Sequence, residues 1–417
     1  MIMETNAVRL YGKKDLRLEQ FELPPIKDDE ILAKVVSDCI CMSSHKAALQ
    51  GADHRRVPND VEVNPIILGH EFSGELIEVG AKWQDAFQAG QKFAIQPALN
   101  YNDSLNAPGY SYPFIGGNAT YVIIPNEVME QNCLLPYSGE AFFYASLAEP
   151  ISCIVGAFQA SYHTKAGSYE HEMGIVKGGN MALLAAAGPM GLGTIDYAMH
   201  CDHKPGMIVV TDINEERLSR AERLLSVEEA AKQGVKLVYL NTKDADTLIN
   251  LTDGHGYDDV FVYVPVAPVV ELGDRILSKD GCLNFFAGPT NPEFLASLNF
   301  YNVHYASTHV VGTSGGNTDD ILKSLSMMES GLIDPAAMIT HIGGLDCVID
   351  VTLNLDIIPG GKKLIYTHLS MPLIAIADFE KIDDRLFSSL ADIVKKNNGR
   401  WCAEAEKYLL NYQRDYV

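Results

Sequence analysis

The stretch PIILGHEFSGELIEVG, residues 65–80, places a histidine and a glutamate directly behind an apolar run. The apolar residues 66–68 indicate a buried strand, and His70 and Glu71 follow it. An ionised carboxylate in apolar surroundings requires a charged partner or a metal. An imidazole nitrogen and a carboxylate oxygen are both good zinc ligands. Taken alone, the pair also fits a solvated surface turn.

Two further segments supply ligands of the same kind. In SDCICMSSHK, residues 37–46, Cys41 is followed two positions later by Ser43. A thiolate binds zinc tightly, and a hydroxyl near an open coordination position can move a proton. Glu149 lies in the apolar segment LAEP, residues 147–150. Cys41 and His70, with Glu71 or Glu149, would leave one coordination position open, as in catalytic zinc sites.

A glycine-rich turn indicates a second binding site. The apolar stretch 181–186 predicts a strand buried on both faces. It runs into Ala186-Ala187-Gly188-Pro189-Met190-Gly191 and then into a helical pattern. The dinucleotide fingerprint G-x-G-x-x-G uses its glycines for a tight turn and close approach to the pyrophosphate. Gly188 and Gly191 match its second and third glycines, and Ala186 replaces the first, which is tolerable at negative φ.

The residues after this turn extend the dinucleotide site. The helix that opens at Pro189 and Met190 would direct its amides toward phosphates. Asp212 ends the next predicted strand, 21 residues past Gly191, where an acid binds the ribose hydroxyls. Asp212 would repel the additional phosphate of NADP, whereas Arg217 would soften that preference. NAD(H) is favoured and NADP(H) stays open; the alternative is a strand–helix turn without a ligand.

Length and charge limit the classes of protein. A chain of 417 residues is too long for one compact core, so two domains are expected. The net charge of −22 argues against nucleic acid or anionic membranes as partners. No stretch reaches the length of a transmembrane helix, and the charged start lacks an apolar signal core, so a cytoplasmic protein is expected. The eight cysteines are scattered, which does not indicate a disulfide framework.

The hydrophobic periodicity changes along the chain. Residues 6–36 alternate apolar and polar positions between turn signals, and no strong helical period precedes about residue 140. Later, helical stretches alternate with strand candidates, which indicates a parallel doubly wound sheet. The strand candidates are 181–186, 207–210, 236–240, 259–264, 281–287 and 309–312.

These patterns predict an α/β protein with two domains. Residues 1–154 form the first part of a β-rich catalytic domain, and residues 155–315 form a dinucleotide-binding domain. Residues 316–417 return to the catalytic domain and end in a helical tail that we interpret as packing.

The motifs together resemble the zinc-dependent medium-chain dehydrogenases, most of all their sorbitol-dehydrogenase-like branch. The resemblance rests on the Cys-x-Ser loop, the GHExxG segment, the Ala-Glu-Pro segment and the Gly-Pro-x-Gly turn. It implies a GroES-like catalytic domain, a Rossmann domain and hydride transfer between NAD(P)H and a ketone or alcohol. It also implies Cys41, His70 and Glu71 as ligands, Glu149 on the metal or one water away, and Ser43 as the first proton relay.

The chain departs from this family pattern in two places. Many relatives hold a structural zinc on four clustered cysteines, but residues 96–117 contain none, so one zinc per chain is expected. Lys46 replaces a relay histidine five residues after the ligand cysteine, with His45 one position earlier, which leaves the relay beyond Ser43 open. Cys39 is two residues from Cys41 and is expected to point away from it in an extended segment.

The substrate is also suggested by resemblance. GADHRRVPNDV (51–61) and PGGKKLIYT (359–367) resemble a sugar-phosphate reductase of this family, which implies conversion of L-sorbose 1-phosphate to D-glucitol 6-phosphate. A phosphorylated substrate needs a local basic patch, and Lys46, Arg55 and Arg56 are the candidates; a solvated loop is the alternative.

Other interpretations of the chain remain open. They are a dehydrogenase of a free polyol or of threonine, and a non-catalytic nucleotide-binding protein. By resemblance, we expect a homodimer or homotetramer paired near residues 309–312.

Overall fold

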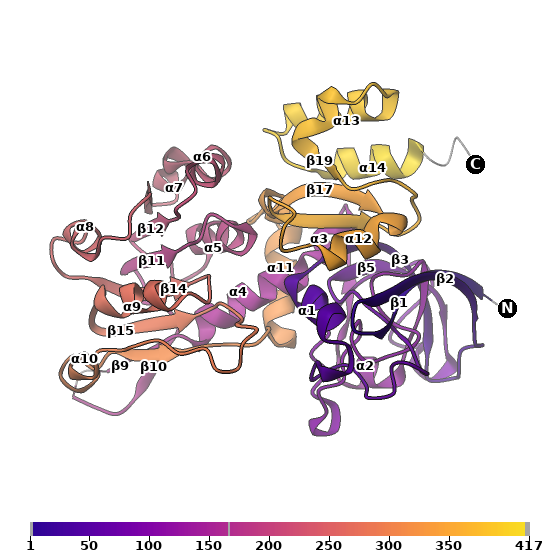
Figure 1. Cartoon of the computed structure of the whole chain (residues 1–417), viewed down its shortest axis with the longest axis horizontal. Coiled ribbons are helices and arrows are strands. Elements are labelled where there is room, and N and C mark those ends of the chain that lie inside the picture. Colours follow the sequence, from indigo (N-terminus) through magenta and orange to yellow (C-terminus); the bar gives the residue numbers. More distant parts are fainter. Residues whose placement is uncertain (1–2, 166, 413–417) are drawn as a thin grey trace. The chain divides into compact units, whose positions relative to one another are not determined.

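The computed structural model describes residues 3–165 and 167–412 (Figure 1). The chain divides into two compact units. The first unit comprises Met1–Pro150, Asn317–Gly331 and Ile339–Val417, and the second comprises Ile151–Gly316 and Leu332–Met338. The predicted α/β fold class is confirmed: the chain contains a β-rich unit and a unit with a parallel doubly wound sheet.

The first unit is built on an eight-stranded sheet. Its order is β19-β17-β18-β3-β5-β6-β8, and β7 pairs with β3 beside this path. The strands are β3 (Ile31–Ile40), β5 (Phe72–Val79), β6 (Lys92–Ile95), β7 (Tyr121–Ile124), β8 (Leu134–Tyr137), β17 (Ile339–Gly344), β18 (Lys362–Tyr366) and β19 (Ile374–Ala375). A smaller sheet joins β2 (Asp15–Leu23), β1 (Met3–Gly12) and β4 (Ile66–Ile67).

Antiparallel pairing around β3 gathers three strand ends at one edge of this sheet. β3 pairs with β5 through Asp38 and Phe72, and with β18 through Ile40 and Lys363. The last residue of β3 therefore lies beside the first residues of β5 and β18. A backbone hydrogen bond from Cys39 N to Glu71 O, 3.0 Å long, continues the pairing past the start of β5.

The helices of the first unit lie around these sheets. They are α1 (Met42–Gln50), α2 (Asn126–Glu130), α3 (Phe142–Ser146), the start of α4 (Ala148–Ala160), α11 (Thr318–Glu329), α12 (Val348–Leu353), α13 (Arg385–Lys396) and α14 (Ala403–Tyr412). α1 and α2 precede residue 140, in the part of the sequence that shows no strong helical period. The inward face of α1 includes the polar Ser44 and His45, so its sequence lacks an apolar helical stripe.

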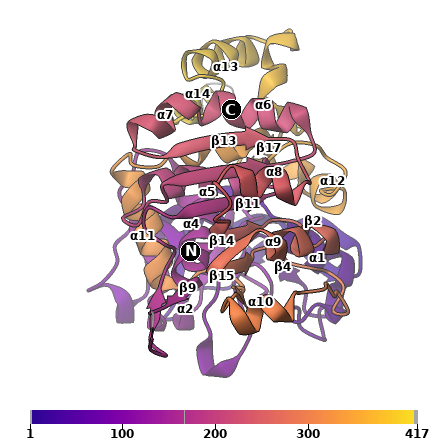
Figure 2. The ribbon, with the colours of Figure 1, turned by 90° about the vertical axis from the view of Figure 1, so that its left-hand side faces the viewer.

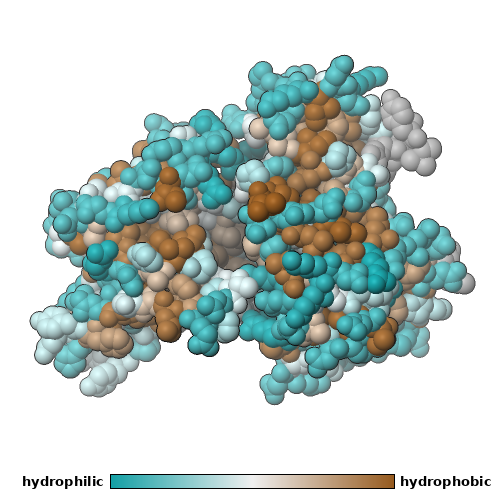
Figure 3. Space-filling model, viewed as in Figure 1, coloured by the Kyte–Doolittle hydropathy of each residue, from teal (hydrophilic) through white to brown (hydrophobic). Residues whose placement is uncertain are grey.

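The C-terminal tail packs on the first unit through α13 and α14 (Figure 1). In Figure 3 hydrophilic atoms form the outer side of α13, and hydrophobic atoms lie beneath them. The buried residues of α13 are Leu386, Leu390, Ala391, Ile393 and Val394. Their spacing of three and four residues places these side chains on one face of the helix.

A buried carboxylate in the tail joins α14 to the rest of the unit. Glu406 is 2% exposed and accepts hydrogen bonds from the amides of Phe142 and Phe143, at 2.6 and 3.0 Å. It also accepts one from the Tyr366 hydroxyl at 2.9 Å, and that oxygen accepts the Trp401 indole N–H at 2.7 Å. The tail thus supplies an acceptor for the unsatisfied amides at the start of α3.

The second unit is built on a six-stranded parallel sheet, and Figure 2 labels its strands β13, β11, β14 and β15 one below another. Its order is β13-β12-β11-β14-β15-β16. The strands are β11 (Asn180–Leu184), β12 (Met207–Thr211), β13 (Lys236–Leu240), β14 (Tyr257–Val262), β15 (Leu277–Phe285) and β16 (His309–Val311). A small hairpin, β9 (Tyr162–Thr164) with β10 (His171–Met173), belongs to the same unit.

Both faces of this sheet are covered by helices. The apolar cluster on one face includes Val209 and Val260 of the sheet, Leu248 of α8 and Leu272 of α9. On the other face, Phe158 of α4 packs 5.1 Å from the Phe261 ring. The helices of this unit are α5 (Pro189–His200), α6 (Glu215–Leu224), α7 (Val227–Lys232), α8 (Ala245–Asn250), α9 (Ala267–Arg275) and α10 (Phe300–Tyr305).

All six strand candidates of this unit exist; β13 has the predicted bounds, and the other five are shifted at one or both ends. The largest differences are at β14, which starts two residues earlier than predicted, and at β15, which starts four residues earlier. Among the described residues, no helix has both the length and the apolar character needed to cross a membrane.

Replacing Glu406 tests the tail's contribution to stability. Burial raises the pKa of Glu406 from 4.5 to about 7, so the folded chain keeps a proton there that the unfolded chain releases. Stability from this group is full below pH ~4.5 and falls as the pH rises through ~7. Glu406→Gln should therefore gain stability relative to the parent between pH 5 and 8, by up to ~3 kcal/mol.

Urea unfolding at pH 5 and pH 8 measures this shift. The exposed Glu404 lies on the same helix, and Glu404→Gln should show no such change with pH. An equal pH dependence in both variants would contradict the assignment.

Candidate active site

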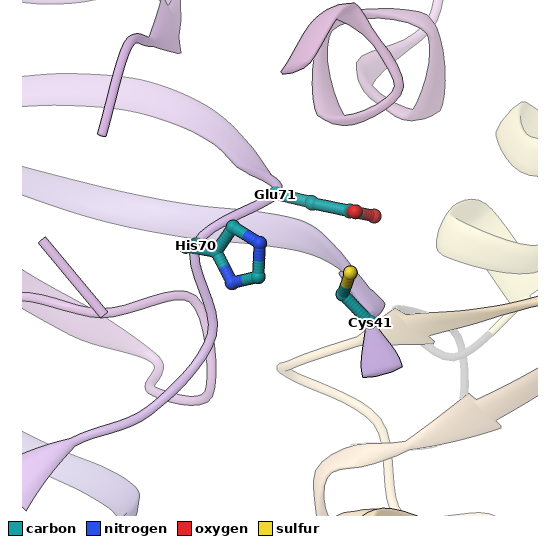
Figure 4. Close-up of side chains that lie close together, drawn as sticks. All are labelled: Cys41, His70 and Glu71. Atoms are coloured by element: carbon teal, nitrogen blue, oxygen red, sulfur yellow. The ribbon is translucent and has the colours of Figure 1, made fainter. Parts of the chain in front are cut away.

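Three potential metal ligands converge where the ends of β3, β5 and β18 meet. The Cys41 sulfur, a His70 ring nitrogen and a Glu71 carboxylate oxygen all lie within 4.8 Å of one another. Figure 4 shows one nitrogen of the His70 ring turned toward the side of the Glu71 carboxylate and the Cys41 sulfur. Among residues 3–165 and 167–412, this is the one group of three or more such side chains close enough to share an ion.

The donor set fits zinc. A thiolate, an imidazole and a carboxylate are the three ligand types that zinc takes in proteins. His70 and Glu71 are buried, and Cys41 is partly buried as the residue preceding α1. Burial, together with the Glu71 charge, raises the pKa of the Cys41 thiol to about 12. A cation at this position would favour the thiolate that burial disfavours.

Two hydroxyls that were not predicted from the sequence flank His70. The Ser44 hydroxyl lies 3.2 Å from Nδ1 of His70, and the Tyr110 hydroxyl lies 3.2 Å from Nε2. Ser44 follows Ser43 on α1, and only its position on the helix distinguishes the two. Hydrogen bonding to one ring nitrogen fixes the orientation of a ligand histidine.

The cation that faces Glu71 was also not predicted from the sequence. Lys362, the first residue of β18, donates to both carboxylate oxygens of Glu71, with the longer contact at 2.6 Å to Oε2. Both side chains are buried, at 5% and 1% exposed. Burial opposes the Lys362 charge, but Glu71 and Cys41 together raise its pKa. Lys362 therefore compensates a carboxylate that would otherwise lie buried and unpaired.

Removing Lys362 should make the stability of the chain depend more strongly on zinc. In the presence of chelator, Lys362→Met should cost about 3–5 kcal/mol in urea unfolding, because it leaves the Glu71 charge buried and unpaired. Added zinc should recover part of this loss, because it supplies another cation to Glu71.

Lys363→Met is the matched control. Lys363 is equally buried, but its ammonium donates to the backbone carbonyls of Pro359 and Gly361, at 2.9 and 2.7 Å. Lys363→Met should also be less stable than the parent chain. Added zinc should raise its free energy of unfolding by no more than it raises that of the parent. Equal zinc recovery in the two variants would contradict the role of Lys362.

Glu149 and Ser43, the other predicted site residues, lie near this group. Glu149 is in the first turn of α4 and is not one of the three converging ligands. Its charge adds to the effects of burial and Glu71 that raise the pKa of the Cys41 thiol. Ser43 is hydrogen-bonded to Tyr110, whose pKa is raised well above its usual range by burial.

The His45 ring contacts α12. Its Nδ1 lies 2.7 Å from the backbone carbonyl of Thr352 on that helix. The buried ring is therefore held by α12.

The predicted basic residues Lys46, Arg55 and Arg56 gather around His54. The pKa of His54 is lowered to about 4 by burial and then by the charges of Arg56, Arg55 and Lys46. Arg56 lies over the Tyr110 ring, with 5.4 Å from its Cζ to the ring centroid. Arg55 is exposed, whereas Lys46 and Arg56 are partly buried. The site therefore has a positive region that reaches His70 through Tyr110.

The glycine-rich turn of the second unit is tightly packed at Gly191 and open at Gly188. A Cβ on Gly191 would lie 1.8 Å from the Ala186 carbonyl oxygen, so only glycine fits there. A Cβ on Gly188 would meet nothing within 4 Å, so space is open beside the turn. The positive φ, 56°, falls on Ala185 and not on Ala186, which explains why alanine is accepted in place of the first glycine.

Asp212 is tied to this turn. Its carboxylate accepts hydrogen bonds from the amides of Ala187, at 3.1 Å, and Asn214, at 3.0 Å. The side chain is buried directly after β12, whereas Arg217 on α6 is exposed. Pro189 and Met190 form the first turn of α5, whose amides face the phosphates in dinucleotide sites.

A GroES-like unit with these converging ligands and a separate unit with a dinucleotide turn define a zinc-type, nucleotide-dependent dehydrogenase. Comparisons with known proteins agree. Residues 27–133 match the alcohol dehydrogenase GroES-like domain, and residues 189–330 match the zinc-binding dehydrogenase family.

Two curated proteins are similar over nearly the whole chain. Mannitol-1-phosphate 5-dehydrogenase of Aliivibrio fischeri is 52% identical over 98% of this chain and 98% of its own. L-sorbose 1-phosphate reductase of Klebsiella pneumoniae is 50% identical over 99% of this chain and 98% of its own. The chain therefore belongs to the zinc-dependent medium-chain dehydrogenase/reductase family, and it is an enzyme of the alcohol and polyol dehydrogenase class.

Solved structures share the fold. The 2R,3R-butanediol dehydrogenase of Bacillus subtilis has a TM-score of 0.70 at 22% identity, covering 87% of this chain and 100% of its own. A zinc-binding dehydrogenase structure from Sinorhizobium meliloti, bound to NADP, has a TM-score of 0.70 at 20% identity, covering 87% and 99%. Zinc and NAD(P) are thus the cofactors of this enzyme class, and the residues described above fit both.

Proposed function

We propose that this chain interconverts L-sorbose 1-phosphate and D-glucitol 6-phosphate, with NAD(H) as the cofactor. The observation that carries this proposal is the positive region beside the converging ligands. Arg56 lies over the Tyr110 ring, and the hydroxyl of that ring is 3.2 Å from His70. On a chain with net charge −22, a local group of cations next to the reacting centre favours an anionic substrate.

The distance between these groups favours one position of the phosphate. L-sorbose 1-phosphate carries it on the carbon next to the carbonyl, whereas a mannitol 1-phosphate oxidised at position 5 carries it four carbons away. The Tyr110 centroid lies 4.7 Å from the His70 centroid and 5.4 Å from Arg56 Cζ. The guanidinium is therefore within about 10 Å of the imidazole, which suits a phosphate next to the reacting carbon.

We assign roles to the residues on this basis. Cys41, His70 and Glu71 hold the zinc, with Glu149 as the nearby alternative carboxylate. When bound, zinc acts as a Lewis acid on the substrate oxygen. Ser43 remains our candidate for the first hydroxyl of the proton relay. Because Ser43 is hydrogen-bonded to Tyr110, the Tyr110 hydroxyl could be the next group of this relay.

NAD(H) is the proposed cofactor because of Asp212. Its carboxylate is fixed by two backbone amides at the end of β12, the place where an acid meets the ribose hydroxyls. A fixed negative charge there opposes the 2′-phosphate of NADP. The exposed Arg217 is the feature that supports NADP(H) as the alternative.

We also propose that the chain forms a homodimer through β16 or the segment before it. β16 is the last strand of its sheet, and an open strand edge offers unpaired backbone groups. Large apolar side chains are exposed nearby, and such a concentration is typical of an interface. These residues are Leu295, Phe300, Tyr301, Val303, Tyr305 and Val310.

Steady-state assays with Arg56→Gln test the phosphate assignment. Arg56→Gln should lower kcat/KM for L-sorbose 1-phosphate by about 10- to 100-fold, the range for losing charged hydrogen bonds. Its kcat/KM for free L-sorbose should change by less than about threefold. The exposed Arg55→Gln is the matched control, with a smaller loss because its charge is more screened.

The same assay separates the alternatives. Fructose 6-phosphate, formed by oxidising mannitol 1-phosphate at position 5, carries its phosphate far from the carbonyl and should react more slowly. Equal losses on phosphorylated and free sugar would exclude Arg56 as the phosphate ligand. Activity confined to free polyols or threonine would exclude the proposed substrate, and running each assay with NADH and NADPH decides the cofactor.

A further inference from the structure

The loop at 96–117, which lacks the cysteines of a structural zinc site, extends to the candidate metal ligands. Its Tyr110 is 2% exposed and contacts three functional groups at once. Its ring lies 4.7 Å from the His70 ring and is stacked 5.7 Å from the His54 ring, at an interplanar angle of 10°. Its third contact is Arg56, 5.4 Å from the ring centroid.

We propose that Tyr110 is the residue that determines selectivity for phosphorylated substrates, because it positions Arg56 relative to His70. This inference rests on the proposed function. An arginine held by an aromatic face keeps its guanidinium edge for hydrogen bonds, and that edge is the part that binds phosphate bidentately. A tyrosine side chain has few rotatable bonds, so one ring can fix the position of the cation.

The loop holds Tyr110 on both sides. A Cβ on Gly109 would lie 2.0 Å from the Gly69 carbonyl oxygen, so the loop backbone packs directly against the residue before His70. The Ser111 hydroxyl donates to the Arg56 carbonyl oxygen at 2.7 Å and accepts the Ala107 amide at 3.0 Å. Residues 109 and 111 therefore attach the loop to the ligand segment and to the arginine segment, with Tyr110 between them.

The Tyr110 hydroxyl connects the same ring to the candidate ligands. It lies 3.2 Å from Nε2 of His70 and is hydrogen-bonded to Ser43. The hydroxyl and the ring face thus have separable roles. The ring face should govern the preference for phosphate, whereas the hydroxyl should affect turnover on every substrate alike.

Two substitutions separate these roles. Tyr110→Leu removes the ring, and the ratio of kcat/KM for L-sorbose 1-phosphate over L-sorbose should fall by about tenfold. Tyr110→Phe keeps the ring, and the ratio should stay within about threefold of the parent. Tyr112→Leu is the matched control, because Tyr112 lies on the same loop but lines a different cavity with Glu127.

A binding measurement supplements these ratios. Calorimetric titration of the zinc-loaded protein with inorganic phosphate, without nucleotide, should show about tenfold weaker binding for Tyr110→Leu than for Tyr110→Phe. If Tyr110→Leu does not fold, Tyr110→Met is used with the same expectations. Equal losses on both sugars, or unchanged phosphate binding in the folded ring-free variant, would overturn the inference.

The outcomes also separate this inference from the proposed function. A parent enzyme with no preference for phosphorylated sugars would reject the proposed function. A parent with that preference, lost in Arg56→Gln but kept in Tyr110→Leu, would reject only the role of Tyr110.

Discussion

The structure depends on one arrangement, in which β3 pairs antiparallel with β5 on one side and β18 on the other. That pairing brings Cys41, Glu71 and Lys362 together although they are far apart in sequence. The opposite charges of Lys362 and Glu71 are then buried at the sheet edge, where each compensates the other. The carboxylate that Lys362 compensates also lies close to a thiol and an imidazole, so the three candidate metal ligands are already together.

Two loops beside this sheet edge carry the residues that we propose select the substrate. The segment after α1 supplies a group of cations, and the loop at 96–117 supplies the ring that joins one of them to His70. This loop contains no cysteine. Here backbone packing against Gly69 and a hydrogen bond to Arg56 hold it in place. The same length of chain thus contributes to the site directly.

Motifs could be read from the sequence because their chemistry is local. The parallel strands are continuous apolar runs, and the glycine turn follows one of them, so the fold class and the strand order in the chain were predictable. Lys362 was not, because a lysine in a short strand gives no sign of burial until β18 is paired with β3. Tyr110 and Ser44 were missed for the same reason: their roles come from contacts across 40 and 26 residues. The short helix α1 was missed because its buried face includes polar side chains.

X-ray absorption at the zinc edge of the purified chain addresses the ligand set most directly. If zinc is bound by Cys41, His70 and either Glu71 or Glu149, the spectrum should show one sulfur about 2.3 Å from the zinc. The remaining neighbours should be nitrogen or oxygen atoms about 2.0–2.2 Å from it. A spectrum without sulfur, or one with several sulfur neighbours, would show that the ion binds elsewhere and would contradict the account.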